Sequence, residues 1–353
     1  MSARQRKTRG KGKTKVTRPH VKLSFKVGCV LLVVVLAYAS VADWFVHHSR
    51  EWLENCRATW PNFVFNPLYN TGNAVGDFTD SLGWTGTDAV YEYDEEAPEG
   101  EVLFAGEPRR MGPPAPDDIV ILDRGEFKIG WSPKLHHPVW AAYHVPREAR
   151  FPNSKRPSFM CDRAVSSAPK PNDYSHTGFD RGHMVPNYAV VTRFGPDAQR
   201  KTFQMTNIAP QSENLNRGVW RDVEHRIAEL WTARYGEIWV IVGAFTPRSE
   251  ASETLAGTAI DLPEKFYQII VAQEGLNIRA LAVLLEQDVH YGTYAARHIV
   301  SIDELEELTG LDFLPDLPSF IQSPLESEVP TRLWPIRFGD VLKGLFMSFR
   351  SRE

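Results

Sequence analysis

The sequence predicts an α+β fold, and two kinds of segment indicate it. Five short runs rich in apolar, β-branched and aromatic residues are bounded by turn residues and favour strands: 119–122, 139–145, 238–242, 265–272 and 278–285. A longer stretch, 215–235, places apolar residues at helical spacing and stops before Gly236, which favours one amphipathic helix. Strands and helices in separate runs are typical of the α+β class.

A second, shorter helix is predicted near residue 301. Ser301 has the side chain of an N-cap residue, Glu304 follows three positions later, and Gly310 is a suitable stop. The chain has 353 residues, of which 42% are hydrophobic and 24% charged, so there is room for one large catalytic domain and accessory segments. The three cysteines have no metal-ligand spacing, and we expect neither a structural disulfide nor a zinc site.

Charge is distributed unevenly along the chain. Residues 1–26 contain ten Lys and Arg and no Asp or Glu, so the rest of the chain has 30 basic against 44 acidic residues, a net charge of −14. Residues 147–226 are the exception, with 13 basic and eight acidic residues. A locally basic region in an acidic molecule is where a polyanion would bind.

The N-terminal part predicts export from the cytoplasm. Residues 27–46 are mostly apolar, interrupted by Asp43, and the 16 residues of 27–42 carry no charge, which is near the lower limit for a membrane span. We therefore expect a basic cytoplasmic tail at 1–26 and a single transmembrane anchor at 27–46, with the catalytic domain outside the cytoplasm. Two alternatives remain: secretion after cleavage of a signal peptide, because Ala-Tyr-Ala at 37–39 suits a signal peptidase, and mitochondrial import.

Two flanking segments have no catalytic pattern. Residues 47–117 contain turn-like, acidic and proline-rich parts, and we expect a juxtamembrane connector there. Residues 314–353 are expected to form a C-terminal tail, in which apolar residues from Phe338 to Phe349 share one helical face. That face either packs against the domain or touches the membrane.

Chemically competent residues concentrate in three motifs. These are D-R-G-H at 180–183, N-x-x-P-Q at 207–211 and L-N-x-x-x-W-x-x-x-E at 215–224. A histidine accepts a proton near neutral pH, an asparagine oxygen suits a hard divalent cation, and arginines neutralise phosphate oxygens. Together they predict a site that cleaves phosphodiesters. A second D-R-G at 123–125 lacks the histidine and predicts a turn.

The three motifs resemble the DNA/RNA non-specific endonuclease family, the ββα-metal (His-Me finger) nucleases that include endonuclease G. The resemblance covers 119–313 and implies a nuclease domain at 118–313 in which helices flank a central antiparallel sheet. It also implies DNA and RNA as substrates and Mg²⁺ as cofactor, with Mn²⁺ as an alternative. A homodimer is a further expectation.

The resemblance implies roles for individual residues. His183 would be the general base and Arg181 would bind the scissile phosphate, while Asp180 and Asn207 would orient and brace the site. Asn216 would ligate the metal, although an asparagine near a helix start is more often an N-cap. Glu224 would hydrogen-bond metal-bound waters. Four further arginines are candidates for phosphate binding: Arg156, Arg163, Arg217 and Arg221.

The function predicted from these roles is Mg²⁺-dependent hydrolysis of DNA and RNA without preference for sugar or base. Two alternatives differ in class. One is a phosphodiesterase that acts on smaller substrates, and the other is a membrane-anchored receptor that binds nucleic acid without cutting it. A receptor would have no use for a base beside a metal ligand.

Overall fold

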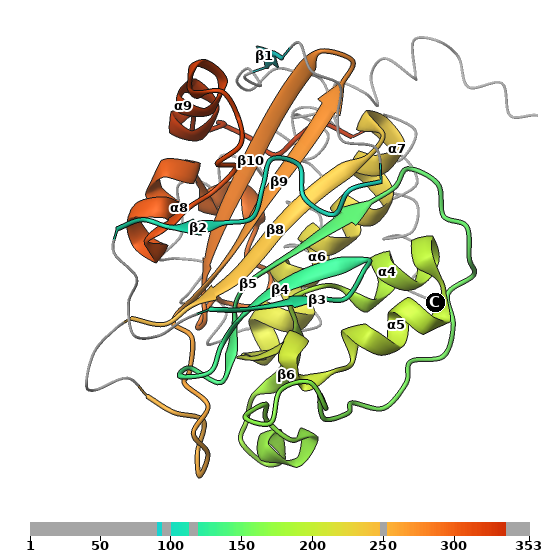
Figure 1. The fold of residues 1–353 in the computed structure, drawn as a ribbon, viewed down its shortest axis with the longest axis vertical. Helices are drawn as coiled ribbons and strands as arrows, with labels where there is room; N and C mark the ends of the chain where they lie inside the picture. The colour runs from blue at the N-terminus through green and yellow to red at the C-terminus, as the bar shows by residue number, and fades with distance from the viewer. Residues whose placement is uncertain (1–89, 94–99, 113–118, 248–252, 337–353) are drawn as a thin grey trace, which may run out of the picture. The chain divides into compact units, whose positions relative to one another are not determined.

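An eight-stranded antiparallel sheet forms the centre of the computed structural model, which describes residues 90–93, 100–112, 119–247 and 253–336 (Figure 1). The strand order is β1-β10-β9-β8-β5-β4-β3, and β11 pairs with β10. The bounds are β1 Tyr91–Glu92, β3 Val120–Asp123, β4 Phe127–Ser132, β5 His137–Val145, β8 Ile238–Phe245, β9 Lys265–Glu274, β10 Asn277–Glu286 and β11 Ile299–Val300. Two short pairs lie outside this sheet: β2 (Arg109–Arg110) with β12 (Leu311–Asp312), and β6 (Asp180–His183) with β7 (Ile208–Gln211).

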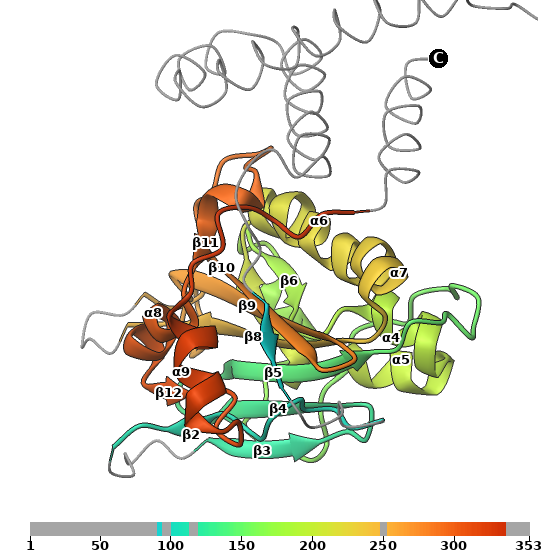
Figure 2. The same ribbon diagram turned by 90° about the horizontal axis from the view of Figure 1, so that it is seen from above.

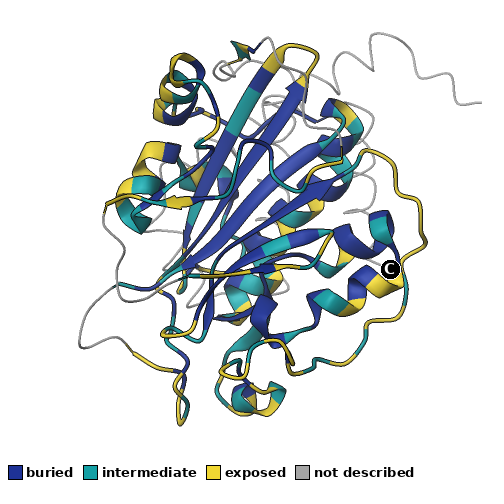
Figure 3. Ribbon diagram, in the orientation of Figure 1, coloured by how far each residue is buried: buried dark blue, intermediate teal, exposed yellow. Residues whose placement is uncertain are grey.

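The central strands are buried on both faces, as the dark blue ribbons of Figure 3 show. Along β5, Ala141 and Tyr143 point into one apolar cluster while Trp140 and Ala142 point into another. Successive side chains of a strand alternate between faces, so a sheet covered on both sides needs unbroken apolar runs. This is why the predicted strand segments show no polar alternation.

Helices cover the two faces of the sheet (Figure 2). One face carries α4 (Asn187–Phe194), α5 (Pro196–Thr202) and a long helical run that ends at Tyr235. The other carries α8 (Ile302–Thr309) and α9 (Ser319–Ser327). The predicted α+β class, with a central antiparallel sheet between helices, is confirmed.

The five predicted strands correspond to β3, β5, β8, β9 and β10. The predicted short helix is α8, where the Ser301 hydroxyl accepts a hydrogen bond of 3.0 Å from the Glu304 amide and Gly310 ends the helix with φ +68°. The second D-R-G motif lies in the turn between β3 and β4, where Gly125 has φ +86° and its amide donates to the Asp123 carboxylate.

The folded region extends beyond the limits of 118 and 313 that the sequence suggested. On the N-terminal side, Tyr93 and Phe104 are buried in the cluster beneath α8 and α9, so part of the expected connector belongs to the domain. On the C-terminal side, α9 and the segment to Ile336 are packed into the core. These segments are held by long-range contacts, which local patterns do not reveal.

The predicted anchor at 27–46 and the apolar face at 338–349 lie outside the described residues. Within the described part of the chain, no helix is long and apolar enough to cross a membrane.

Candidate active site

The three motifs form a strand–strand–helix unit. Strand β6 (Asp180–His183) pairs antiparallel with β7 (Ile208–Gln211), so that Asp180 lies opposite Gln211 and His183 opposite Ile208. The chain then enters the helical run, made of η3 (Leu215–Val219), α6 (Trp220–His225), η4 (Arg226–Trp231) and α7 (Thr232–Tyr235). The ββα arrangement implied by the resemblance is therefore present, and it places the three motifs side by side.

His183 is enclosed by two aromatic rings. Its imidazole centroid lies 5.3 Å from the ring of Phe159 and 4.8 Å from that of Phe203, and the residue is 8% exposed. Burial and, to a smaller extent, the positive charge of Arg156 together lower the pKa of His183 to about 3. The imidazole is thus neutral at physiological pH and able to accept a proton. Its Nε2 atom is buried without a hydrogen-bond partner.

An arginine lies against each ring of this aromatic pair. The guanidinium carbon of Arg156 is 5.5 Å from the Phe203 ring centroid, and that of Arg181 is 5.5 Å from the Phe159 ring centroid. Arg181 is held further by hydrogen bonds from its Nε and Nη2 atoms to the Pro171 carbonyl, at 3.0 and 2.7 Å. Two predicted phosphate-binding cations therefore flank the predicted base.

Asp180 ties the first strand to the helix. Its carboxylate accepts a hydrogen bond of 2.9 Å from Asn216 Nδ2 and bonds of 2.8 and 2.7 Å from Arg217. Burial acts to raise the pKa of Asp180, but the hydrogen bonds from Arg217 and Asn216 outweigh it and the pKa is lowered. Because Asp180 takes the amide nitrogen of Asn216, the amide oxygen Oδ1 is left to face a cation.

This geometry fits a hard divalent metal at Asn216. A neutral amide oxygen, oriented by a carboxylate behind it, is a donor that Mg²⁺ accepts together with water. Arg217, a further candidate for phosphate binding, makes two hydrogen bonds to Asp180 and donates to Glu213 at 2.8 Å. In this structure these bonds hold the start of the helix.

Asn207 makes hydrogen bonds to the chain that follows His183. It is fully buried, its Oδ1 accepts from the Val185 amide at 2.9 Å, and its Nδ2 donates to the carbonyls of Val185 and Thr202 at 3.0 Å. Its own carbonyl accepts from the Met184 amide at 2.9 Å. Asn207 therefore fixes the chain that leaves His183, and it offers no polar atom to a substrate.

Glu224 is half-buried on α6, and Arg156 links it to the histidine. Burial raises the pKa of Glu224, and Trp220, Arg156 and Arg221 act to lower it; the effect of burial is larger, and the resulting pKa is about 8. The indole Nε1–H of Trp220 makes no well-aligned hydrogen bond, but it is close enough to the Glu224 carboxylate to lower the pKa of that group. Since Arg156 influences both His183 and Glu224, these three groups belong to one site. Among the described residues, no contact links the exposed Arg163 to them.

Gln211 is a site residue to which the motif analysis gave no chemical role. It is fully buried, and neither its Oε1 nor its Nε2 has a hydrogen-bond partner. Its amide lies against Gly182, where any Cβ atom would overlap it. The glycine of D-R-G-H is therefore required because the glutamine of N-x-x-P-Q packs against it. In the sequence, the only indication of this contact was that both motifs are present.

A separate acidic cluster, missed at the sequence level, lies on α8 and α9. Oxygen atoms of Asp303, Glu306 and Glu326 are all within 4.8 Å of one another. These helices cover the face of the sheet opposite the ββα unit (Figure 2). The cluster is thus distinct from the site around Asn216.

Comparisons with known proteins identify the family of the chain. The family model described as DNA/RNA non-specific endonuclease matches residues 105–320. A protein named nuclease from Nostoc sp. is 28% identical over 64% of this chain and 85% of its own length. Human mitochondrial endonuclease G is 26% identical over 56% of this chain and 70% of its own.

Two further matches extend the comparison. The mouse mitochondrial nuclease EXOG is 29% identical over 51% of this chain, and the match spans about half (53%) of the mouse protein. The solved structure of an EndoG/EndoGI complex has a chain with TM-score 0.51 and 20% identity, covering 56% of this chain and 86% of that one, which supports the fold. With a family model covering more than half of its residues, the chain belongs to the DNA/RNA non-specific endonuclease family and is an endonuclease that hydrolyses nucleic acids.

Proposed function

We propose that the protein is an Mg²⁺-dependent endonuclease that cuts DNA and RNA without preference for sugar, with His183 as the general base and Asn216 as the metal ligand. The observation that carries the proposal is the 2.9 Å hydrogen bond from Asn216 Nδ2 to Asp180. It joins the strand that carries the histidine to the start of the helix, and it uses the amide nitrogen of Asn216 so that the oxygen is available to a cation. Either His183 or Asn216 alone would not distinguish a nuclease from a nucleic-acid receptor.

In the proposed reaction, His183 takes a proton from the attacking water. Its Nε2 is enclosed without a partner, so Nδ1 is the nitrogen left for that water. The low pKa keeps the imidazole neutral before the reaction, and the charge of Arg156 favours release of the proton afterwards. Arg181 and Arg156, each in contact with one ring of the aromatic pair, neutralise the charge that develops on the phosphate oxygens.

The cation would be held by Asn216, and Glu224 would hydrogen-bond the water molecules around it. When bound, Mg²⁺ supplies Lewis-acid stabilisation of phosphate charge. The contribution of the chain is to place the ligand oxygen through Asp180, which Arg217 keeps ionised. We infer that contacts to phosphate dominate substrate binding, which would make the enzyme indifferent to base sequence.

The test is cleavage of supercoiled plasmid and of single-stranded RNA, with Mg²⁺ and with EDTA. We expect both substrates to be degraded only with the metal. His183→Ala should reduce turnover by at least a hundredfold with binding retained. His225→Ala, at an exposed histidine on α6, is the matched control and should cleave normally. Normal turnover by His183→Ala would contradict the assignment of the base.

For the destination of the enzyme, we infer that residues 1–46 direct the nuclease domain out of the cytoplasm. A membrane anchor is the first possibility, and mitochondrial import is the alternative that the mitochondrial relatives support. Cell fractionation followed by carbonate extraction separates them. An anchored protein stays in the membrane pellet, whereas an imported and processed protein is recovered soluble from mitochondria, shortened at its N-terminus.

A further inference from the structure

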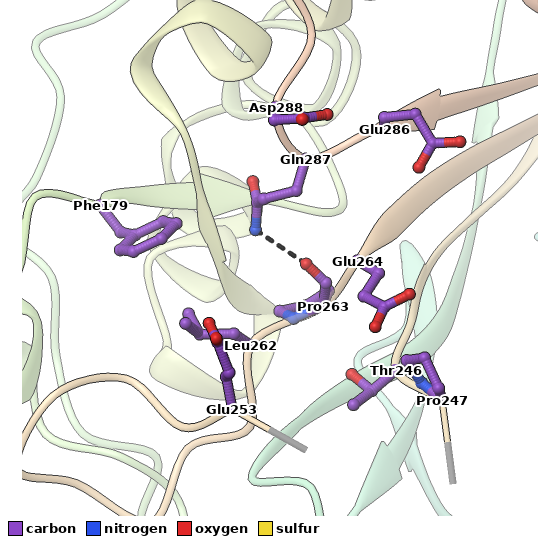
Figure 4. A pocket seen from close by; sticks show the side chains of 10 residues that line it. All are labelled: Phe179, Thr246, Pro247, Glu253, Leu262, Pro263, Glu264, Glu286, Gln287 and Asp288. Carbon is purple, nitrogen blue, oxygen red and sulfur yellow. Dashed lines mark hydrogen bonds between the residues drawn. The ribbon is translucent and has the colours of Figure 1, made fainter. Parts of the chain in front are cut away.

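Gln287 lies at the junction between strand β7 and the helix that carries Asn216, although it is 71 residues away in sequence. Its side-chain Oε1 accepts a hydrogen bond of 2.8 Å from the Ser212 amide. Its Nε2 donates to the carbonyl of Pro210 at 2.9 Å and to that of Pro263 at 3.0 Å, the second of which is drawn in Figure 4. The side-chain amide of Gln287 therefore binds the backbone on both sides of Gln211.

Ser212 completes a reciprocal pair with Gln287. Its hydroxyl donates to the Gln287 carbonyl, while its amide is bound by the Gln287 side chain. Ser212 is also the first support of the helix, because its carbonyl accepts from the Asn216 amide at 2.9 Å and its hydroxyl accepts from the Leu215 amide at 3.3 Å. The backbone of Asn216 is thus one hydrogen bond away from the residue that Gln287 holds.

Gln287 also lines a cavity of about 460 Å³ with Phe179, the residue immediately before Asp180 (Figure 4). Strand β10, the strand that Gln287 follows, is part of the central sheet, and β6 and β7 are not. The contacts of Gln287 are therefore a direct link between the rigid sheet and the ββα unit.

We propose that Gln287 is a positioning residue that sets the place of the metal ligand Asn216. The proposal rests on the proposed function of Asn216. A single neutral amide contributes little binding energy, so its oxygen has to be presented in the right place before the cation arrives. Asp180 fixes the direction of that amide, and Gln287, through Ser212, fixes the point from which the side chain starts. Partners behind a ligand typically change metal affinity or activity by about 10- to 100-fold.

The test measures metal affinity in the absence of substrate. Mn²⁺ serves as the probe, and the free ion is followed by electron paramagnetic resonance as it is titrated into the full-length chain. Gln287→Met keeps the size of the side chain and removes its three hydrogen bonds. We expect the Kd for Mn²⁺ to rise about tenfold, and the metal concentration that gives half-maximal plasmid cleavage to rise in parallel.

Gln322→Met is the matched control. Gln322 is also half-buried and donates through Nε2 to Asp312, to the Phe313 carbonyl and to Glu326 at 3.2–3.3 Å, but it lies on α9, on the opposite face of the sheet. It should lower thermal stability as Gln287→Met does and leave the Kd for Mn²⁺ unchanged. A purely structural role for Gln287 would make the two variants behave alike.

Ser212→Ala is the second variant if Gln287→Met does not fold. It removes the hydroxyl's bonds to the Gln287 carbonyl and from the Leu215 amide, and it keeps the bond from the Ser212 amide to the Gln287 side chain. It should weaken Mn²⁺ binding severalfold. An unchanged Kd in the folded variants would overturn the role of Gln287. Asn216→Ala separates this result from failure of the proposed function. If Asn216→Ala also binds Mn²⁺ normally, Asn216 is not the ligand and both proposals are refuted. If only Asn216→Ala binds Mn²⁺ weakly, the role of Gln287 is refuted and the role of Asn216 stands.

Discussion

At the scale of single residues, two aromatic side chains decide the protonation state of His183. Phe203 is buried, whereas Phe159 is only half-buried and forms the solvent side of the pair. Phe159→Ala should admit water to the imidazole and raise the pKa of His183 from about 3 toward its ordinary value near 6.5. The acidic limb of the kcat/KM profile should then move up by about one pH unit or more.

Plasmid cleavage between pH 4 and pH 8 checks this shift. Phe320→Ala, at a phenylalanine that is 69% exposed on α9, is the control and should keep the wild-type profile. A uniform drop in rate with an unmoved acidic limb would mean that Phe159 supports the fold and does not set the pKa of the base.

Gly182 and Gln211 make a second prediction at this scale. Gly182→Ala places a Cβ atom against the Gln211 amide and should cost about 1–3 kcal/mol of unfolding free energy. In a Gln211→Ala background the same change should cost less than about 0.5 kcal/mol, because the overlapping atoms are gone. Urea unfolding of the four proteins measures the coupling. Equal costs in both backgrounds would show that the glycine is needed for another reason.

The contrast between Arg217 and His183 shows what the sequence could reveal about the site. The motifs predicted one site that contains His183 and Asn216, and the β6–β7 pairing and the Asp180–Asn216 bond link the elements that carry them. The hydrogen bonds of Arg217 to Asp180 join residues that are 37 positions apart, and no local spacing encodes such a contact. The enclosure of His183 by Phe159 and Phe203 is likewise a tertiary contact without a sequence pattern.

At the scale of elements, the helix over 215–235 was predictable in extent and not in form. Gly236 ends it with φ +93°, but η3 and η4 are π segments, and Gly218 departs from helical geometry. Eight α-helical steps leave Glu224 about 80° from Asn216 around the axis. A π segment takes more residues per turn, so it reduces that offset and brings the two side chains toward one face. Apolar spacing cannot register such a local change.

Helices α8 and α9 lead to a prediction about stability. Burial, the charge of Glu306 and the charges of Asp303 and Asp312 raise the pKa of Glu326 to about 8. Burial and the charges of Asp312 and Asp303 raise the pKa of Glu306 to about 7. Gln322 and the Phe313 amide act in the opposite direction. The folded state therefore keeps protons that the unfolded chain releases above its ordinary pKa, near 4.3. The stability that these groups provide is complete below that pH and is lost as pH rises toward 8.

Glu326→Gln removes one of these ionisations and keeps the shape. We expect its melting temperature to match wild type at pH 5 and to exceed it by several degrees at pH 8.5. Differential scanning calorimetry at the two pH values measures the difference. Glu307→Gln, at an exposed glutamate on α8, should show no such pH-dependent gain. If Glu326→Gln were less stable than wild type at both pH 5 and pH 8.5, the carboxyl group of Glu326 would not be protonated in the folded state.

At the scale of the whole molecule, the C-terminal segment closes the core over the helix of the active site. The ring of Trp334 lies 5.5 Å from Trp231 and 5.4 Å from Tyr235, and both of these residues donate hydrogen bonds to the backbone of 334–335. A domain that ended at 313 would leave this end of the helix uncovered. The segment has no periodic pattern because its few apolar residues enter the core from an irregular chain, which is why the sequence suggested a tail.

Trp334→Ala tests the importance of this closure. Trp334 is 2% exposed, and truncating a buried tryptophan typically costs about 3–5 kcal/mol of unfolding free energy. Because the lost contacts are on η4 and α7, beyond Glu224, the variant should still cleave plasmid at 20 °C and lose activity at a lower temperature than wild type. Phe320→Ala, which removes an exposed ring from α9, should change the free energy by less than about 0.5 kcal/mol. If Trp334→Ala proved as stable as Phe320→Ala in urea, the segment to Ile336 would be an appendage and the nuclease fold would be complete without it.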